Sequence, residues 1–175
     1  VPNFSEGRNL DIIDKIASAV KSTQNVKLLN VEPDKDYNRT VITFAGEPSG
    51  VKEAAFNAIS TASELIDMSR QKGEHPRIGA TDVCPIIPVA NATREECVKL
   101  ANELGSEVGE KLGIPVYLYE DAARSEERRN LENIRKGEYE GLEQKLRDWV
   151  PDYGPAEYND KVRKSGATVI GARFF

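Results

Sequence analysis

The sequence predicts an α+β fold in which helices pack on one face of a mixed, mainly antiparallel sheet. Segments with helical periodicity alternate with short apolar segments along most of the 175 residues, a pattern typical of a sheet covered by helices. Two neighbouring apolar segments separated only by a polar turn indicate a local hairpin. No glycine-rich loop joins a first strand to a first helix, which disfavours a doubly wound fold. The length suits a single domain over residues 1–175.

The first half of the chain is expected to form a helix, a hairpin and a second helix. Residues 9–22 place isoleucine, alanine and valine at helical spacing. Residues 26–31 and 40–45 are rich in β-branched and apolar residues and indicate two strands, with the polar turn 33–37 between them. After a break at Gly46–Gly50, residues 51–69 form a long amphipathic pattern.

The histidine-containing loop comes next, followed by a strand and a capped helix. The apolar segment 83–89 contains two prolines, which favour an irregular or edge strand. Thr93 followed by Glu96 predicts a capping box at the start of a helix. That helix is expected to run to about Leu112 and to stop at Gly113.

The last third combines two strands with a charged region. Residues 115–119 and 167–172 read as short strands. Residues 120–148 are rich in charge and are expected to form short exposed helices, whereas 152–166 show no clear periodicity. The opening residues 1–8 read as a polar turn that caps the first helix, and a first strand is expected ahead of them. This order fits a ferredoxin-like layer, because βαββαβ units combine a hairpin with crossover helices.

Composition excludes several classes of function. A net charge of −5 and an isoelectric point of about 5.1 disfavour nucleic-acid binding, which usually requires an excess of positive charge. No apolar run approaches the roughly 20 residues of a membrane span. Cys84 and Cys97 form no closely spaced pair and are expected to be buried, reduced thiols, which points to a cytoplasmic protein.

The chain has one histidine, His75, in the segment GEHPRIGATD. Imidazole is the side chain whose ordinary pKa lies nearest neutrality, so it can both accept and return a proton. Pro76 favours an extended backbone at His75, and Gly73 and Gly79 permit tight or positive-φ turns on either side. A surface loop without a function is the alternative at this point. A lone histidine is weak evidence for zinc, and no metal is expected.

Three other segments are candidates for a site. The opening residues 1–8 are polar, and a structural role in capping the first helix would explain them. The hairpin segment Tyr37–Thr40 is also polar, and its asparagine and arginine could equally well satisfy loop carbonyls. The irregular stretch 152–166 is long for a compact domain, and such loops are usually functional or disordered. No GxSxG, P-loop or HExxH motif occurs.

Taken together, six motifs resemble the glutamate formimidoyltransferase family along almost the whole chain. They are, in order, VPNFSEGR, NRTVITFAG, DMSRQKGEHPRIGATDVCPIIPV, PVYLYEDAA, IRKGEYEGL and VPDYGP with GATVIGAR. The resemblance is to the amino-terminal subdomain of the family's transferase region, for which it implies a ferredoxin-like fold.

The resemblance implies transfer of a formimino group from N-formimino-L-glutamate to tetrahydrofolate, in histidine degradation and one-carbon metabolism. Tetrahydrofolate would be a co-substrate. His75 matches the family's catalytic histidine and is the expected general base and general acid. The folate-binding stretch corresponds to the segment from Gly154 to Gly166.

The needs of this chemistry suggest further site residues, beside the Gly154–Gly166 stretch that the resemblance implies. Both substrates carry carboxylates, which guanidinium groups bind in bidentate fashion, and Asp82 or Glu32 could orient the imidazole. The expected substrate-binding and folate-binding residues are Asn38, Arg39, Arg77, Asp82, Gly154, Pro155, Tyr158, Gly166 and Arg173.

Two further readings stay open. In the family a second subdomain follows the GAR strand and substrates bind between the two halves, so the partner is either that second subdomain or another copy of the chain. A chain without the second half could be a non-catalytic folate-binding or assembly module. A small regulatory ligand-binding domain without a connection to folate is the third possibility.

Overall fold

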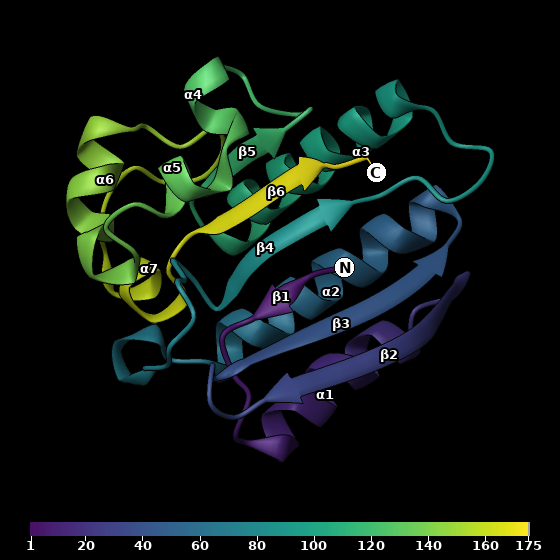
Figure 1. Ribbon diagram of the computed structural model, residues 1–175, viewed down its shortest axis with the longest axis horizontal. Helices are drawn as coiled ribbons and strands as arrows, with labels where there is room; N and C mark the ends of the chain where they lie inside the picture. Colours follow the sequence, from purple (N-terminus) through teal and green to yellow (C-terminus); the bar gives the residue numbers. More distant parts are fainter. Residues whose placement is uncertain (175) are drawn as a thin grey trace.

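A computed structural model of the protein describes residues 1–174 and shows an open mixed sheet with helices packed against it (Figure 1). Phe175, the last residue of the expected domain, lies outside the described residues. The sheet order is β2-β3-β1-β4-β6-β5. The strands are β1 (Asn3–Phe4), β2 (Val26–Asp34), β3 (Arg39–Gly46), β4 (Thr81–Ile86), β5 (Val116–Glu120) and β6 (Thr168–Ala172).

The helices begin and end largely where local signals predict. Thr93 and Glu96 form the predicted capping box, and Gly113 ends the helical run in the left-handed conformation (φ 64°). The α-helices are α1 (Leu10–Lys21), α2 (Pro48–Leu65), α3 (Arg94–Glu107), α4 (Glu126–Arg129), α5 (Leu131–Arg135), α6 (Leu142–Asp148) and α7 (Asp160–Ser165). Shorter turns are η1 (Met68–Arg70), the π-helical η2 (Val108–Leu112) and η3 (Tyr139–Gly141).

The first part of the sheet has the predicted ferredoxin-like topology. Strands β2, β3, β1 and β4 lie side by side, each antiparallel to its neighbour, and α1 and α2 form the two crossovers. The rest of the sheet is parallel, because β6 pairs with β4 on one side and with β5 on the other. The α+β class and the mainly antiparallel sheet are therefore confirmed.

The core lies between the sheet and the three long helices, which cover one face (Figure 1). Along β3 buried and half-buried residues alternate, as expected for a strand with one covered face. Strands β4 and β6 are buried along their whole length. Near β5 the second face is covered as well, since Arg128 of α4 lies over the Tyr117 ring, 5.4 Å from its centroid.

The structure differs from the sequence predictions at three elements. The opening segment, expected to be a polar turn, contains the short strand β1, whereas the strand expected ahead of Val1 lies outside this sequence and stays a prediction. Strand β4 is an interior strand and not an edge. A short helix, α7, occupies part of the stretch for which no regular structure was expected.

Pro85 shows why an interior strand tolerates proline here. The carbonyl of Pro85 faces the β1 side of β4, where it accepts a hydrogen bond from the amino group of Val1 at 3.3 Å. In a strand, the N–H and C=O positions of one residue point to the same side. The missing N–H of Pro85 therefore lies beyond the paired residues Asn3 and Phe4 of the short β1, and no ladder hydrogen bond is lost.

Among residues 1–174, none of the helices has both the length and the apolar character needed to cross a membrane.

Candidate active site

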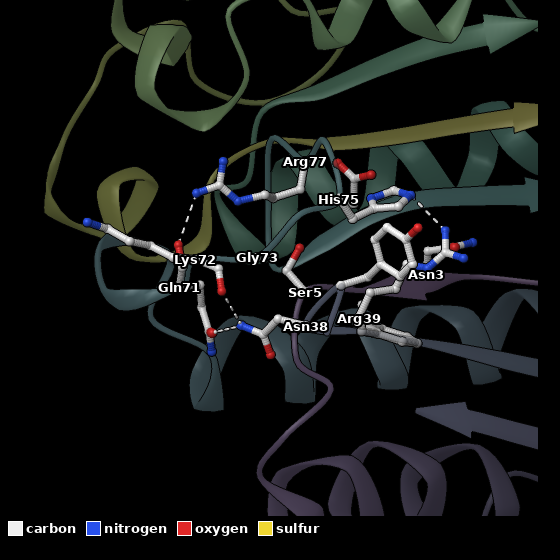
Figure 2. Close-up of a pocket in the computed structure, with 12 residues that line it drawn as sticks. Asn3, Ser5, Asn38, Arg39, Gln71, Lys72, Gly73, His75 and Arg77 are labelled. Carbon is white, nitrogen blue, oxygen red and sulfur yellow. Dashed lines mark hydrogen bonds between the residues drawn. The ribbon is translucent and has the colours of Figure 1, made fainter. Parts of the chain in front are cut away.

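The loop 71–80 connects η1 to β4 and lies against the β2–β3 turn and the end of β1 (Figure 2). It brings His75 to a small polar pocket. The residues that line this pocket are Asn3, Phe4, Ser5, Tyr37, Asn38, Arg39, Gln71, Lys72, Gly73, His75, Arg77 and Asp82. The structure thus brings together five of the predicted site residues, Asn38, Arg39, His75, Arg77 and Asp82, from two separate segments of the chain.

The side chain of His75 is in direct contact with Arg39, the first residue of β3. A guanidinium nitrogen of Arg39 lies 2.7 Å from Nε2 of His75 (Figure 2). Because arginine has no acceptor, it must be the donor, and Nε2 must carry a lone pair. This contact assigns a neutral imidazole whose proton is on Nδ1. The Tyr37 ring meets the imidazole edge-on, with the ring centroids 6.4 Å apart.

The surroundings of His75 favour its neutral form. Burial lowers the pKa of His75 below its ordinary value, and the positive charges of Arg39 and Arg135 lower it further. The negative charge of Asp82 and a hydrogen bond with the Pro76 backbone act in the opposite direction and are weaker. An imidazole that is neutral at physiological pH can accept a proton, which is the first requirement for a general base.

Asp82 lies at the base of the pocket and is buried. One carboxylate oxygen accepts the backbone N–H of Ile78 at 2.7 Å, and the other accepts a hydrogen bond from Arg135 of α5. Burial raises the pKa of Asp82, while Arg135 and the Ile78 N–H oppose that rise. Asp82 therefore shapes the loop around His75 and contributes charge to the site.

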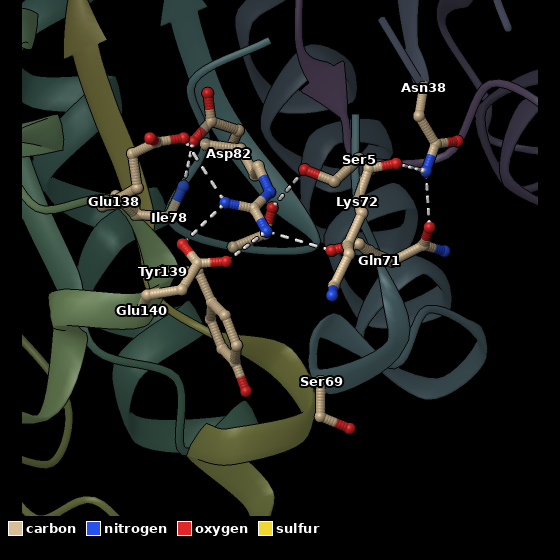
Figure 3. A network of polar contacts seen from close by, with 12 residues as sticks. Ser5, Asn38, Ser69, Gln71, Lys72, Ile78, Asp82, Glu138, Tyr139 and Glu140 are labelled. Atoms are coloured by element: carbon tan, nitrogen blue, oxygen red, sulfur yellow. Dashed lines mark hydrogen bonds and ion pairs between the residues drawn. The ribbon is translucent and has the colours of Figure 1, made fainter. Parts of the chain in front are cut away.

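Arg77 is held by acidic residues of the chain itself. Its guanidinium forms a bidentate pair with Glu140, at 2.8 and 2.9 Å, and also contacts Glu138 and the carbonyl of Gln71 (Figure 3). The backbone N–H of Tyr139 donates to the carbonyl of Arg77 at 2.9 Å. Arg77 thus ties the histidine loop to the η3 turn, so its five donors are largely used before any substrate arrives.

Asn38 joins three segments through one amide side chain. Its oxygen accepts the backbone N–H of Gly7, and its NH2 group donates to the side chain of Gln71 and to the carbonyl of Lys72. The backbone of Asn38 is in the left-handed region (φ 53°), which asparagine tolerates better than most residues. These hydrogen bonds match the structural alternative, in which Asn38 satisfies loop groups, and its predicted role in substrate binding stays a prediction.

The two glycines that flank His75 are required for close approach rather than for positive φ. Neither is among the described residues with positive φ. A Cβ on Gly73 would lie 2.3 Å from the carbonyl oxygen of Tyr37, and one on Gly79 would lie 1.9 Å from that of Ala167. The histidine loop is therefore pressed against the β2–β3 turn on one side and the start of β6 on the other.

The predicted folate-binding segment lies away from this pocket. Gly154 packs against Ile114, with φ at +83°. Pro155 and Tyr158 border a shallow surface hollow beside α6. Gly166 ends α7 and pairs with Gly79, so it is the member of this group that touches the histidine loop.

Arg173 and Glu32 are also separated from His75. The backbone N–H of Arg173 donates to the carbonyl of Ile86, at the opposite end of β4 from the histidine loop. Glu32 is exposed on the edge strand β2 and is not among the residues that line the pocket. The structure thus separates both residues from the imidazole, and their predicted roles in substrate binding and in orienting the ring stay predictions.

The cavity beside His75 has a volume of about 10 Å³, room for one water molecule. A larger cavity of about 410 Å³ lies at the other end of β4, lined mainly by apolar residues together with Cys84 and Cys97. Both thiols are free and buried, as predicted. The polar pocket with His75 and the larger cavity therefore lie at opposite ends of β4.

Three residues of the site were not expected from the sequence. Glu138 and Glu140 contact Arg77 of the histidine loop, and Arg135 contacts Asp82 of β4; all three come from the region 120–148, which was expected to be exposed and charged. All three lie within the motif IRKGEYEGL. That motif was the available signal, although nothing in it indicates which residues it contacts.

The fold and the site define an α+β domain that holds one neutral imidazole between a guanidinium and a buried carboxylate, an arrangement suited to proton transfer. Residues 1–173 match the model of the formiminotransferase domain, N-terminal subdomain, and the chain belongs to this family.

Named relatives are similar over the whole chain. It is 53% identical to a formimidoyltransferase-cyclodeaminase of Gallus gallus, covering 100% of this chain and 32% of that protein. It is 48% identical to a glutamate formimidoyltransferase of Thermoplasma acidophilum, covering 100% of this chain and 58% of the relative. A glutamate formimidoyltransferase of Streptococcus pyogenes serotype M1 is 45% identical, with coverages of 99% and 58%. The chain thus spans about a third to just over half the length of these relatives.

Proposed function

We propose that this chain supplies the proton-transfer histidine of a glutamate formimidoyltransferase, which moves the formimino group of N-formimino-L-glutamate to tetrahydrofolate. The observation that carries the proposal is the neutral imidazole of His75, held by Arg39 in a polar pocket. Membership of the formiminotransferase family and the names of the relatives support the class of reaction.

The proposed reaction needs one group that first accepts and then donates a proton. N5 of tetrahydrofolate attacks the formimino carbon and a C–N bond forms. His75 takes the proton that leaves N5 on its Nε2, which becomes free when Arg39 turns from the imidazole to the substrate carboxylate. The bond from that carbon to the glutamate nitrogen then breaks, and His75 returns the proton to this nitrogen. The products are 5-formiminotetrahydrofolate and glutamate. General acid–base catalysis of this kind contributes on the order of 10²–10⁴ in rate.

Arg39 is the favoured carboxylate-binding residue. It uses one N–H on His75 and has further donors for a substrate carboxylate. Arg77 is a weaker candidate because both terminal nitrogens of its guanidinium already donate to Glu140. The folate contacts are assigned to the segment from Gly154 to Gly166.

The setting implied by this reaction is histidine degradation. The buried free thiols of Cys84 and Cys97 support a reducing compartment such as the cytoplasm.

The small volume beside His75 favours a second candidate function. A cavity of about 10 Å³ cannot enclose a folate, because sites for ligands of that size have volumes of roughly 300–1,000 Å³. The chain alone would then be a non-catalytic folate-binding or assembly module that another subdomain or a second copy completes.

The test is to mix the chain with tetrahydrofolate and N-formimino-L-glutamate and to follow formation of 5-formiminotetrahydrofolate, with His75→Ala as the control. Turnover that falls by about 10²-fold or more in the variant supports the transferase. Folate binding without turnover supports the second candidate. Turnover that His75→Ala leaves unchanged would overturn the assigned role of the histidine.

A further inference from the structure

Arg135 is the last residue of α5 and reaches a carboxylate beneath the histidine loop. Its guanidinium donates to one oxygen of Asp82, whose other oxygen accepts the backbone N–H of Ile78. The side chain of Asp82 is 3% exposed and that of Arg135 is 17% exposed. The pair is therefore largely removed from water, where a charge without a partner is costly.

This ion pair faces His75 together with other charged groups. Arg39 of β3 contacts the ring, and Asp82 of β4 lines the same pocket. Tyr37 of the β2–β3 turn presents its ring edge-on to the imidazole. The charged residues of the histidine loop itself are Lys72, Glu74 and Arg77, the last of which is neutralised by Glu140 and Glu138.

Without a partner, Asp82 would change the chemistry of the imidazole. A buried carboxylate next to a histidine favours the charged imidazolium, and an imidazolium cannot accept a proton. Arg135 removes this influence in two ways, because it neutralises Asp82 and because its own positive charge disfavours a proton on His75.

We propose that Arg135 is a positioning residue of the histidine site, which pairs with Asp82 and thereby keeps the imidazole of His75 in its neutral, proton-accepting form. This gives a role to the motif IRKGEYEGL, which contains Arg135 and which the reaction itself does not use. The effect of Arg135 on the protonation of His75 is argued from the contacts alone. The effect on the rate of turnover rests on the proposed function.

The single histidine makes the proposal directly measurable. NMR spectra of the ring protons and nitrogens report the titration and the tautomer of His75 without interference from other histidines. The variants are Arg135→Gln, which removes the charge, and Arg135→Lys, which keeps it. Arg147→Gln is the matched control, because Arg147 lies on α6, is 66% exposed and pairs with Glu143.

The expected result is an upward shift of the His75 midpoint in Arg135→Gln, larger than any change in Arg147→Gln, and a midpoint close to that of the unmodified chain in Arg135→Lys. Asp82→Asn should shift the midpoint downward. An unchanged midpoint in a folded Arg135→Gln variant would overturn the proposal, as would an equal shift in Arg135→Lys. Backbone NMR spectra establish that each variant is folded.

A kinetic arm separates this proposal from the transferase assignment. In a protein that turns over, the acid limb of the pH profile of kcat/KM should move to higher pH in Arg135→Gln and not in Arg147→Gln. If no turnover occurs but the NMR shift is found, the transferase assignment fails and the role of Arg135 stands. If turnover occurs with an unmoved acid limb, the role of Arg135 fails.

Discussion

Arg39 donates a hydrogen bond of 2.7 Å to Nε2 of His75, so the lone pair of the imidazole is aimed at a permanent positive charge. The two residues are 36 positions apart in the sequence. They meet because the β2–β3 turn and the loop before β4 lie on the same end of the sheet. The contact defines both the protonation state and the tautomer of the candidate base.

Removing Arg39 should make His75 more basic. In Arg39→Ala, the nearby positive charge and the donor to Nε2 are both lost, so the pKa of His75 rises and both neutral tautomers become populated. An NMR titration of the single histidine measures both effects. Arg70→Ala, at an arginine that is 87% exposed, is the control and should leave the titration unchanged. A pKa that stays constant or falls in Arg39→Ala would show that the contact does not form in solution.

The link between Arg77 and Glu140 should stabilise the histidine loop modestly. Glu140→Gln removes the bidentate carboxylate and is expected to lower the free energy of unfolding by about 1 kcal/mol, because Glu140 is largely exposed and screened by water. Urea denaturation measures the loss. Glu143→Gln, in an exposed pair on α6, should change stability by less than about 0.5 kcal/mol. Equal losses in the two variants would mean that Glu140 has no special role.

Gly79 should tolerate no side chain. A Cβ there would lie 1.9 Å from the carbonyl oxygen of Ala167, so the histidine loop and β6 would have to separate. Gly79→Ala is therefore expected to cost about 3 kcal/mol or more, or to prevent folding. Gly141→Ala is the matched control, since nothing lies within 4 Å of its Cβ, and it should be close to neutral. Thermal unfolding of both variants checks the prediction, and a stable Gly79→Ala protein would contradict the close approach.

Stability should fall as the solution becomes acidic, in part because of His75. Burial and Arg39 lower the pKa of His75 in the folded protein below its ordinary value of 6.5, so the unfolded chain binds the proton more tightly. The free energy of unfolding contributed by this group is present above pH 6.5 and is lost as the pH falls through the folded pKa. Urea denaturation at about pH 7 and about pH 5.5 tests this. His75→Asn should show a smaller loss between the two pH values, and an equal loss would exclude His75 as the cause.

Local signals predicted most elements of the fold. The limits of α3 and η2 follow from Thr93, Glu96 and Gly113, which act within one turn of the helix ends. The interior position of β4 could not be predicted in this way, because Pro85 favours an edge strand and is tolerated between β1 and β6 only because β1 is short. The short α7 lacks the length that a periodic pattern requires.

The sequence predicted the site residues that lie in short motifs. It did not predict the residues that pair with them from distant parts of the chain. His75, Arg77 and Asp82 belong to one segment, and Asn38 and Arg39 belong to the hairpin turn. The partners of this segment in the region 120–148 were not predicted. Arg135 is 53 residues from Asp82 and Glu140 is 63 residues from Arg77. Such pairings arise from tertiary folding, and a charged sequence looks the same whether its charges face water or one another.

The position of β6 has a consequence for the order in which the chain becomes native. The last strand in the sequence fills the gap between β4 and β5, so β5 has no neighbour in the sheet until β6 arrives. The segment that leads into β6 also pairs with the histidine loop, where Ala80 donates to the carbonyl of Ser165 and Ala167 donates to that of Ile78. During synthesis, therefore, the region around His75 emerges from the ribosome early and gains its final shape only after β6 has followed. Contacts of such long sequence separation slow folding, and the histidine site depends on one of them for its final shape.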